Sequence, residues 1–243
     1  MHIIKLNATE STNSYLRELS ADKTLDDNTI VVAKHQTKGK GQMGAQWNTD
    51  PGKNLTFSVL KLTSGVVIDN HFDISMITSL AILDTLERFG IPKVLVKWPN
   101  DILSEEKKIC GILIENIIKK KNINKTIIGI GLNVNQSEFK NLPRATSMKI
   151  QTGRLFDLDE LLIIIATHLE KCFDEYKEKG TVVLQKRYMK HLFRLEKPST
   201  FRTKKGDNIT GIIKGIDPKG NLMVLHEDQV LTTYKFKEVE LLY

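Results

Sequence analysis

The chain has 243 residues, 40% of them hydrophobic, and a formal net charge of +7. This length is sufficient to bury a substantial core in one or two domains. Two cysteines, Cys110 and Cys172, are too few for a disulfide framework and lack metal-site spacing, and the sequence contains no signal peptide and no apolar run of transmembrane length. We therefore expect a cytoplasmic protein with no membrane partner.

The first predicted elements are a strand over residues 2–7 and a helix over residues 12–20. Between them lies the polar run 10–14, Glu-Ser-Thr-Asn-Ser. Ser11 or Thr12 is expected to cap the helix through its side-chain oxygen. The same helix start leaves backbone N–H groups free, so capping is compatible with ligand contact.

A glycine-rich basic loop follows over residues 38–47, between predicted strands at 29–35 and 54–62. Its glycines allow backbone N–H groups to approach an anion, while Lys38 and Lys40 supply positive charge. The spacing does not match the phosphate loop that precedes a helix, so classical nucleotide-binding folds are disfavoured. The alternative is a solvated surface loop whose Trp47 packs at its base.

The pentapeptide Lys-Trp-Pro-Asn-Asp at 97–101 ends a strand predicted over residues 93–98, which follows a helix predicted over 73–90. A second strand is predicted over residues 108–118, and the polar tip between the two indicates a hairpin. Such a hairpin would place Asp101 near Lys108. The alternative is a surface ion pair, which contributes little to stability.

The strand predicted over residues 125–135 contains Gly129 and Gly131 and ends in asparagines, including Asn133. Glycines inside a strand often mark the close approach of a ligand or of another backbone. The lysine run 119–121 before it is interpreted as a solvated hairpin tip, and because no arginine-rich or aromatic-interleaved patch accompanies it, no DNA partner is expected.

In the C-terminal third, Asp157 and Glu160 form the start of a predicted helix whose apolar stripe runs to Gly180. After Pro198, short β-like segments alternate with turns at 204–207 and 217–221. The predicted fold is therefore α/β, of the α+β kind, with a mixed sheet over residues 1–194 and a small all-β domain over residues 195–243.

Taken in order, these motifs resemble the biotin protein ligases, also called biotin–acetyl-CoA-carboxylase ligases. The resemblance rests on Ser-Thr-Asn at 11–13, the basic glycine loop ending in Trp47, Lys-Trp-Pro-Asn-Asp at 97–101, Lys-x-x-Gly-Ile-Leu at 108–113 and Gly-x-Asn at 131–133. It implies the catalytic fold shared by biotin and lipoate ligases and class II aminoacyl-tRNA synthetases, followed by an SH3-like barrel. It also implies a form without the N-terminal DNA-binding domain of some relatives, because the first strand begins at His2.

The resemblance further implies the site residues, and it leaves metal ligands unassigned. The biotin-binding residues it implies are Ser11, Thr12, Asn13, Gln36, Gly39, Lys40, Gly41, Gln42, Trp47, Lys108 and Gly111. The nucleotide-binding residues are Lys40, Asn100 and Asn133, and the catalytic residues are Lys40, Asp101 and Lys108. One departure is that Gln42 and Ala45 replace two arginines of the family's loop, which lowers the charge available to hold an acyl-adenylate.

The expected function is ATP-dependent activation of biotin as biotinyl-5′-AMP and its transfer to one lysine of a biotin carboxyl carrier protein, with Mg²⁺ assisting. Cations and backbone N–H groups suit this chemistry because two anions must approach each other at the α-phosphate. Two alternatives stay open, a lipoate ligase and a module that binds biotin or a nucleotide without turnover. The oligomeric state is not determined by the sequence, which allows a homodimer.

Overall fold

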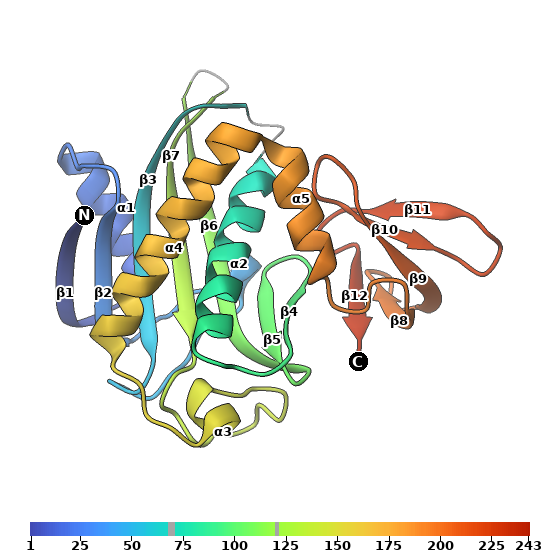
Figure 1. Cartoon of the computed structure of the whole chain (residues 1–243), viewed down its shortest axis with the longest axis horizontal. Helices are drawn as coiled ribbons and strands as arrows, with labels where there is room; N and C mark the ends of the chain where they lie inside the picture. Colours follow the sequence, from blue (N-terminus) through green and yellow to red (C-terminus); the bar gives the residue numbers. More distant parts are fainter. Residues whose placement is uncertain (68–70, 120–121) are drawn as a thin grey trace.

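The computed structural model describes residues 1–67, 71–119 and 122–243, and it contains two β-sheets (Figure 1). The larger sheet has seven strands in the order β1-β2-β3-β7-β6-β5-β4. Strands β1 and β2 are parallel, and the other neighbours are antiparallel. The strands are β1 (His2–Thr9), β2 (Thr29–Gln36), β3 (Leu55–Val67), β4 (Val94–Lys97), β5 (Asp101–Ser104), β6 (Lys107–Lys119) and β7 (Asn122–Leu132).

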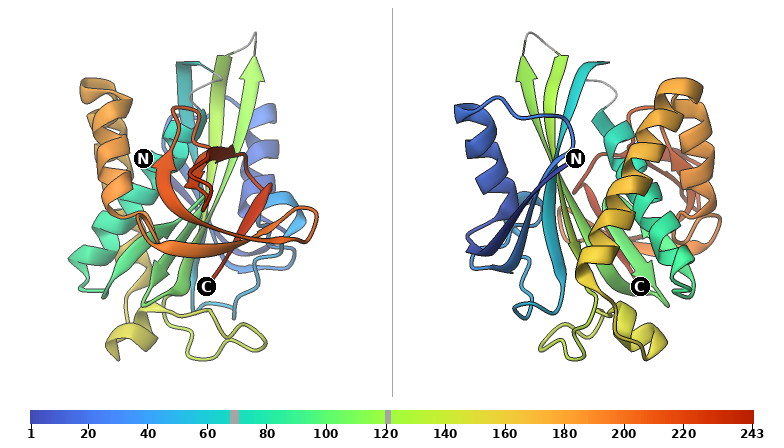
Figure 2. Two further views of the ribbon diagram at one scale, coloured as in Figure 1. Left: turned by 90° about the vertical axis from the view of Figure 1, so that its right-hand side faces the viewer. Right: turned by 60° about the vertical axis from the view of Figure 1, so that its left-hand side comes forward.

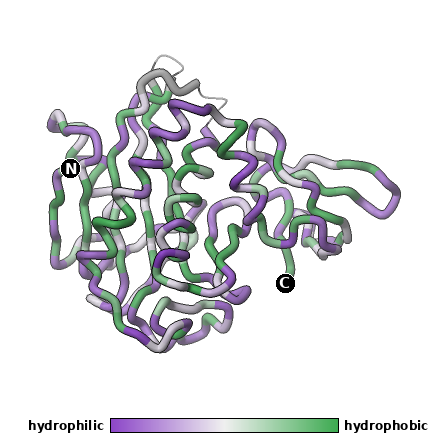
Figure 3. The backbone as a smooth tube through the Cα atoms, in the orientation of Figure 1, coloured by the Kyte–Doolittle hydropathy of each residue, from purple (hydrophilic) through white to green (hydrophobic). Residues whose placement is uncertain are grey.

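Helices cover both faces of this sheet (Figure 2). Helix α1 (Thr12–Asp22) lies on one face, where Leu16 packs against the buried strand residues Val31, Leu60 and Ile127. Helices α2 (His71–Arg88), α4 (Leu158–Lys179) and α5 (Thr181–Lys190) lie on the other face over the main hydrophobic core. The central strands are green along much of their length in Figure 3, because residues buried on both faces are apolar.

The second sheet is formed by the C-terminal residues and has five antiparallel strands in the order β11-β10-β9-β8-β12. Its strands are β8 (Pro198–Thr203), β9 (Asn208–Ile216), β10 (Leu222–Leu225), β11 (Leu231–Tyr234) and β12 (Val239–Leu242). A hydrogen bond of 2.8 Å from the indole of Trp98 to the carbonyl of Gly220 connects it to the pentapeptide 97–101. The mixed α+β class and the separate C-terminal sheet are confirmed.

Several local predictions are confirmed and others need correction. Asp157 caps α4, since its side chain accepts a hydrogen bond from the backbone N–H of Glu160. Ser11 occupies the N-cap position of α1, as predicted, but its side chain makes no capping hydrogen bond. The short helices α3 (Met148–Thr152) and α5 were not predicted. The predicted lysine tip at 119–121 lies largely outside the described residues.

Candidate active site

The floor of the site is a hollow in the large sheet, made by glycines on β6 and β7. Gly111 pairs with Gly131 across these strands, and Leu113 pairs with Gly129. A Cβ atom on Gly131 would lie 2.3 Å from the Trp47 ring, and one on Gly129 would lie 2.2 Å from the side-chain oxygen of Asn13. Since real Cβ atoms do not approach other atoms so closely, both positions need glycine for the side chains above them to fit.

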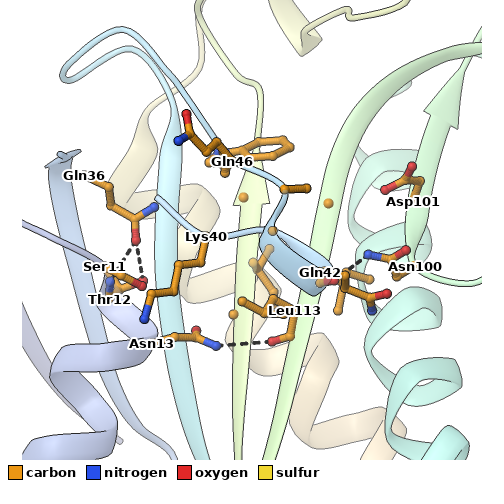
Figure 4. Close-up of a pocket in the computed structure, with 18 of the residues that line it drawn as sticks. Ser11, Thr12, Asn13, Gln36, Lys40, Gln42, Gln46, Asn100, Asp101 and Leu113 are labelled. Atoms are coloured by element: carbon orange, nitrogen blue, oxygen red, sulfur yellow. Dashed lines mark hydrogen bonds between the residues drawn. The ribbon is translucent and has the colours of Figure 1, made fainter. Parts of the chain in front are cut away.

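A cavity of about 390 Å³ lies above this floor, a volume typical of small-molecule sites (Figure 4). It brings together most of the residues expected to bind biotin, which come from α1, β2, the loop 38–47 and β6. Those that line it are Ser11, Thr12, Asn13, Gln36, Lys40, Gly41, Gln42, Trp47, Lys108 and Gly111, together with Asn100 and Asp101.

Two expected site residues lie outside this cavity. Gly39 does not line it; a Cβ on Gly39 would lie 2.1 Å from the Trp47 carbonyl, so this glycine permits the loop to close on itself. Asn133 lines a second cavity of about 360 Å³, which it shares with Trp47, Lys108 and Arg144. Its amide donates to the carbonyl of Thr146 at 3.0 Å.

One end of the cavity is a hydrogen-bonded polar network around the start of α1. The backbone N–H and the hydroxyl of Thr12 both donate to Gln36 Oε1, at 2.8 and 3.0 Å. Because that oxygen accepts two hydrogen bonds, the Gln36 amide group is oriented with its nitrogen away from Thr12. The buried Ser58 hydroxyl lies within hydrogen-bonding distance of both Thr12 and Asn13.

The side-chain nitrogen of Asn13 is also hydrogen-bonded. It donates to Glu115 Oε2 at 2.9 Å, and Glu115 forms an ion pair with Arg17 at 3.2 Å. Neither Ser58 nor Glu115 was identified from the sequence. Ser58 lies within a strand that looks purely structural, and Glu115 follows an apolar run, so only the strand pairing brings them to Asn13.

The other end of the cavity carries the predicted acid–base pair. Lys108 Nζ lies 2.6 Å from Asp101 Oδ1, so the expected proximity is confirmed. The side chains are only 35% and 19% exposed, which distinguishes the pair from a solvated surface contact. Asn100 fixes the base of this hairpin, since its side chain donates to the Ile112 carbonyl at 2.8 Å.

The loop 38–47 crosses the cavity between these two ends (Figure 4). The backbone N–H of Trp47 donates to the Gly39 carbonyl at 2.9 Å, and Lys40 Nζ donates to the Ser14 hydroxyl at 2.7 Å. The Trp47 ring lies against the glycine floor, with Lys108 Nζ 5.6 Å from its centroid. Within the described residues, Trp47 Nε1 and Gln42 Oε1 are buried without hydrogen-bond partners.

Three lysines and two carboxylates line the cavity, so its formal charge is positive. Burial lowers the pKa of Lys97, and the nearby Lys108 and Arg144 lower it further, whereas Asp101 and Glu240 oppose the shift. Burial also raises the pKa of the neighbouring Cys110 thiol well above its usual range, which makes that thiol an inert packing group. Lys237 and Glu240 of the C-terminal sheet also line the cavity and were missed from the sequence.

Resident metal ligands are absent from the described ranges: no cluster of three or more His, Cys, Asp or Glu side chains there could hold an ion. Asp101 and Glu240 are the carboxylates that line the cavity. This donor set fits Mg²⁺ that is bound mainly by nucleotide phosphates and water, with at most one or two protein carboxylates. In the same described part of the chain, no helix is long and apolar enough to span a membrane.

Both parts of the chain are similar to known protein families. Residues 6–133 match the model of the "Biotin/lipoate A/B protein ligase family", and residues 195–242 match the "Biotin protein ligase C terminal domain". The bifunctional ligase/repressor BirA of Bacillus subtilis is 28% identical over 239 residues, which cover 96% of this chain and 72% of that protein. The biotin–[acetyl-CoA-carboxylase] ligase of Paracoccus denitrificans is 27% identical, with 90% and 92% covered.

Among solved structures, the biotin protein ligase of Aquifex aeolicus in complex with biotin and ATP superimposes with a TM-score of 0.83. It is 28% identical, and the match covers 99% of this chain and 98% of that one. The family match spans more than half of the chain, and the C-terminal match covers all strands of the second sheet. The chain therefore belongs to the biotin/lipoate A/B protein ligase family, and within it to the biotin protein ligases.

Proposed function

We propose that this protein activates biotin with ATP as biotinyl-5′-AMP and then transfers the biotinyl group to one lysine of a biotin carboxyl carrier protein. The observation that carries the proposal is that one cavity joins a directional polar network, at Thr12, Asn13 and Gln36, to the Asp101–Lys108 pair. The first end offers donors and acceptors to a ureido ring, and the second offers charge to a carboxylate and a phosphate.

In the first half-reaction, a carboxylate oxygen of biotin forms a bond to the α-phosphorus of ATP. The bond from that phosphorus to the oxygen bridging to the β-phosphorus breaks, and pyrophosphate leaves with the bonding electrons. We assign to Lys108 the stabilisation of negative charge at the α-phosphate, since its Nζ faces the cavity beside Asp101. Lys40 and the loop amides supply further positive potential. Asp101 and Glu240 are the carboxylates that would help to hold Mg²⁺ here, and the ion would neutralise part of the triphosphate charge.

In the second half-reaction, the neutral amine of the carrier lysine attacks the carbonyl carbon of the mixed anhydride. The carbon–oxygen bond to phosphate breaks, AMP leaves, and the amine nitrogen loses a proton. We assign to Asp101 the orientation of this amine or the acceptance of its proton. The adenine is proposed to occupy the cavity of about 360 Å³ that contains Asn133 and Trp47.

The test is exchange of labelled pyrophosphate into ATP, measured with biotin, with lipoate and with neither. We expect exchange that depends on biotin. Exchange with lipoate alone would instead make the protein a lipoate ligase. Absence of exchange with both acids, while biotin still binds by calorimetry, would favour a binding module, for which the loss of two arginines at Gln42 and Ala45 is the supporting observation.

A further inference from the structure

The side chain of Tyr243, after the last strand, contacts two cations at the edge of the site. Lys97 Nζ is 5.0 Å from the centroid of its ring, and the guanidinium carbon of Arg144 is 4.6 Å from it. The ring of Phe193 meets the Tyr243 ring edge to face, with centroids 5.1 Å apart. Cations over an aromatic face are attracted by its negative potential, and more strongly where water is partly excluded.

The backbone places each of these side chains beside the active-site hairpin. The carbonyl of Arg144 accepts a hydrogen bond of 2.7 Å from the N–H of Lys108, so Arg144 is fixed next to the proposed α-phosphate ligand. Phe193 donates from its backbone N–H to the carbonyl of Val96 at 2.8 Å, which fixes it next to Lys97. The half-buried Tyr243 thus joins a strand end, a loop and the C-terminal sheet.

Among the described residues, neither cation has a carboxylate in direct ion-pair contact, although Asp101 and Glu240 are near enough to Lys97 to act on it electrostatically. In the described part of the chain, Asp101 pairs with Lys108, whereas neither Lys97 nor Arg144 forms an ion pair within 4.0 Å. Two positive charges held by a neutral ring, rather than by a carboxylate, remain available to an incoming anion. Burial raises the pKa of the Tyr243 phenol, which keeps the ring neutral at physiological pH.

We propose that Tyr243 is a positioning residue that holds Lys97 and Arg144 as the binding site for the β- and γ-phosphates of the nucleotide, the part that leaves as pyrophosphate. The inference rests on the proposed function. Lys108 marks the α-phosphate, and the adenine cavity is lined by Lys108, Arg144 and Tyr243 themselves. We place the two phosphates beyond the α-phosphate near these two cations because both adjoin Lys108: Arg144 accepts its backbone hydrogen bond, and Lys97 pairs across β4 and β5 with its partner Asp101.

The experiment compares the affinities of two nucleotides by calorimetry: α,β-methylene ATP, which carries the outer phosphates and cannot be cleaved at the α–β link, and AMP, which lacks them. Replacing the ring in Tyr243→Leu should weaken binding of the ATP analogue by about fivefold or more, since two cation–π contacts are lost. AMP affinity should fall by less, because AMP lacks the two phosphates that the cations are proposed to bind, although the Tyr243 ring also lines the adenine cavity. Tyr243→Phe should retain most of the wild-type affinity because it keeps the ring.

Tyr234→Leu is the matched control, because Tyr234 lies on β11 of the same sheet and hydrogen-bonds to His226. It should leave both affinities unchanged. Equal weakening of both nucleotides by Tyr243→Leu, no weakening of either, or a Phe variant as weak as the Leu variant would overturn the proposal. These affinities do not depend on turnover, so they test Tyr243 even if the wild-type chain lacked biotin-dependent exchange, which would contradict the proposed function instead.

Discussion

The ion pair between Lys108 and Asp101 couples two side chains that we assign to successive half-reactions. At 2.6 Å, the lysine charge is directed at Asp101 until an anion enters the cavity. An incoming phosphate oxygen competes with that carboxylate for the ammonium protons, because Lys offers several donors from one point charge. Each of the two residues therefore sets the electrostatic environment of the other. Variants of either residue must be assayed separately for adenylation and for transfer.

Lys108→Ala is expected to slow biotinyl-adenylate formation by about a hundredfold or more, the usual cost of removing one well-placed charge-stabilising group. The measurement is pyrophosphate exchange at saturating biotin and ATP. Circular dichroism serves as the control for folding. A folded variant that exchanges pyrophosphate at the parent rate would show that Lys108 does not act at the α-phosphate.

Asp101→Asn keeps the shape of the side chain and loses its negative charge. If Asp101 serves the acceptor amine, transfer should slow more than adenylation. Preformed biotinyl-adenylate on the variant is mixed with a carrier domain in a single-turnover assay, and adenylation is measured separately. Equal losses in both steps, or transfer at the parent rate, would mean that Asp101 mainly organises Lys108 or the nucleotide.

The sequence predicted the Asp101–Lys108 contact because both residues belong to one local hairpin. It did not identify Lys237, Glu240 or Tyr243, which lie more than a hundred residues downstream. Their position depends on how the second sheet docks, and no local periodicity encodes that contact. The roles assigned to the individual site residues stay predictions.

At the scale of elements, the loop 38–47 is a small closed structure. Lys40 and Gln46 form an isolated antiparallel β-bridge, and the backbone N–H of Gly41 donates to the Ala45 carbonyl at 2.7 Å. Few apolar side chains anchor this loop apart from Trp47. Low local burial implies a small free energy of local opening.

Hydrogen exchange of the amides at 38–47 should therefore slow when biotin or the adenylate is added, because the ligand covers the loop and excludes water. The measurement is exchange followed by mass spectrometry, with and without ligand. Amides of the buried helix α2 provide the internal control, since their protection reflects global stability. Equal protection of the loop in both states would contradict a lid function.

A buried carboxyl group lies where α2 meets the start of α5, on the face of the large sheet opposite α1. Asp73 in the first turn of α2 accepts a hydrogen bond of 2.8 Å from the hydroxyl of Thr181 at the start of α5. Its pKa is raised from the ordinary value of 3.8, mainly by burial. The folded protein therefore binds this proton more tightly than the unfolded chain does.

Because the pKa of Asp73 differs between the folded and unfolded states, the free energy of unfolding depends on pH. The stability contributed by protonated Asp73 is fully present below about pH 3.8 and is lost as pH rises through the raised folded value. The unfolding free energy of the wild type should consequently fall relative to that of Asp73→Asn between pH 4 and 7. Urea denaturation of both proteins across this range is the measurement, and a pH-independent difference would contradict it.

The sequence predicted a helix correctly where its apolar pattern is long. The stripe from Asp157 to Gly180 predicted α4 because its apolar residues repeat with helical spacing. Helix α5 begins directly after Gly180 and buries only Leu184 and Tyr188, so its apolar pattern is too sparse to predict a helix. Helix α3 has five residues and is too short for periodicity to show.

At the scale of the whole molecule, the contact between the two sheets depends on a glycine turn. Gly220 has a φ of +83°, and a Cβ atom there would lie 2.0 Å from the ring of Phe72 on α2. The carbonyl of the same residue accepts the hydrogen bond from Trp98. The pentapeptide 97–101 is thereby connected to the turn between β9 and β10.

Gly220→Ala should lower the free energy of unfolding by more than about 1 kcal/mol, because it adds a steric clash to an unfavourable backbone conformation. It should also raise the KM for ATP, since Lys237 and Glu240 would shift relative to the cavity. Gly206→Ala is the matched control: its φ is +97°, and beyond its two chain neighbours the added Cβ would meet no described atom within 4 Å. Equal destabilisation by both variants would show that backbone strain alone acts at Gly220.

The order of strands in the large sheet could not be predicted. Pattern analysis located β3, β6 and β7 approximately, but only the folded chain shows that β7 lies between the other two. The β6–β7 hairpin pairs Gly111 with Gly131 in the hollow floor, and β3 pairs with the other edge of β7. The domain boundary between residues 194 and 195 stays a prediction.

The two tryptophans of the chain occupy different functional positions. Trp47 lies on the loop that crosses the cavity, with its ring against the glycine floor, and Trp98 lies where the two sheets meet. Indole emission depends on the polarity and hydrogen bonding of its surroundings. The protein therefore contains two intrinsic fluorophores that need no added label. Trp47 would report on the predicted closure of the loop 38–47 over a ligand, and Trp98 on the contact between the two sheets.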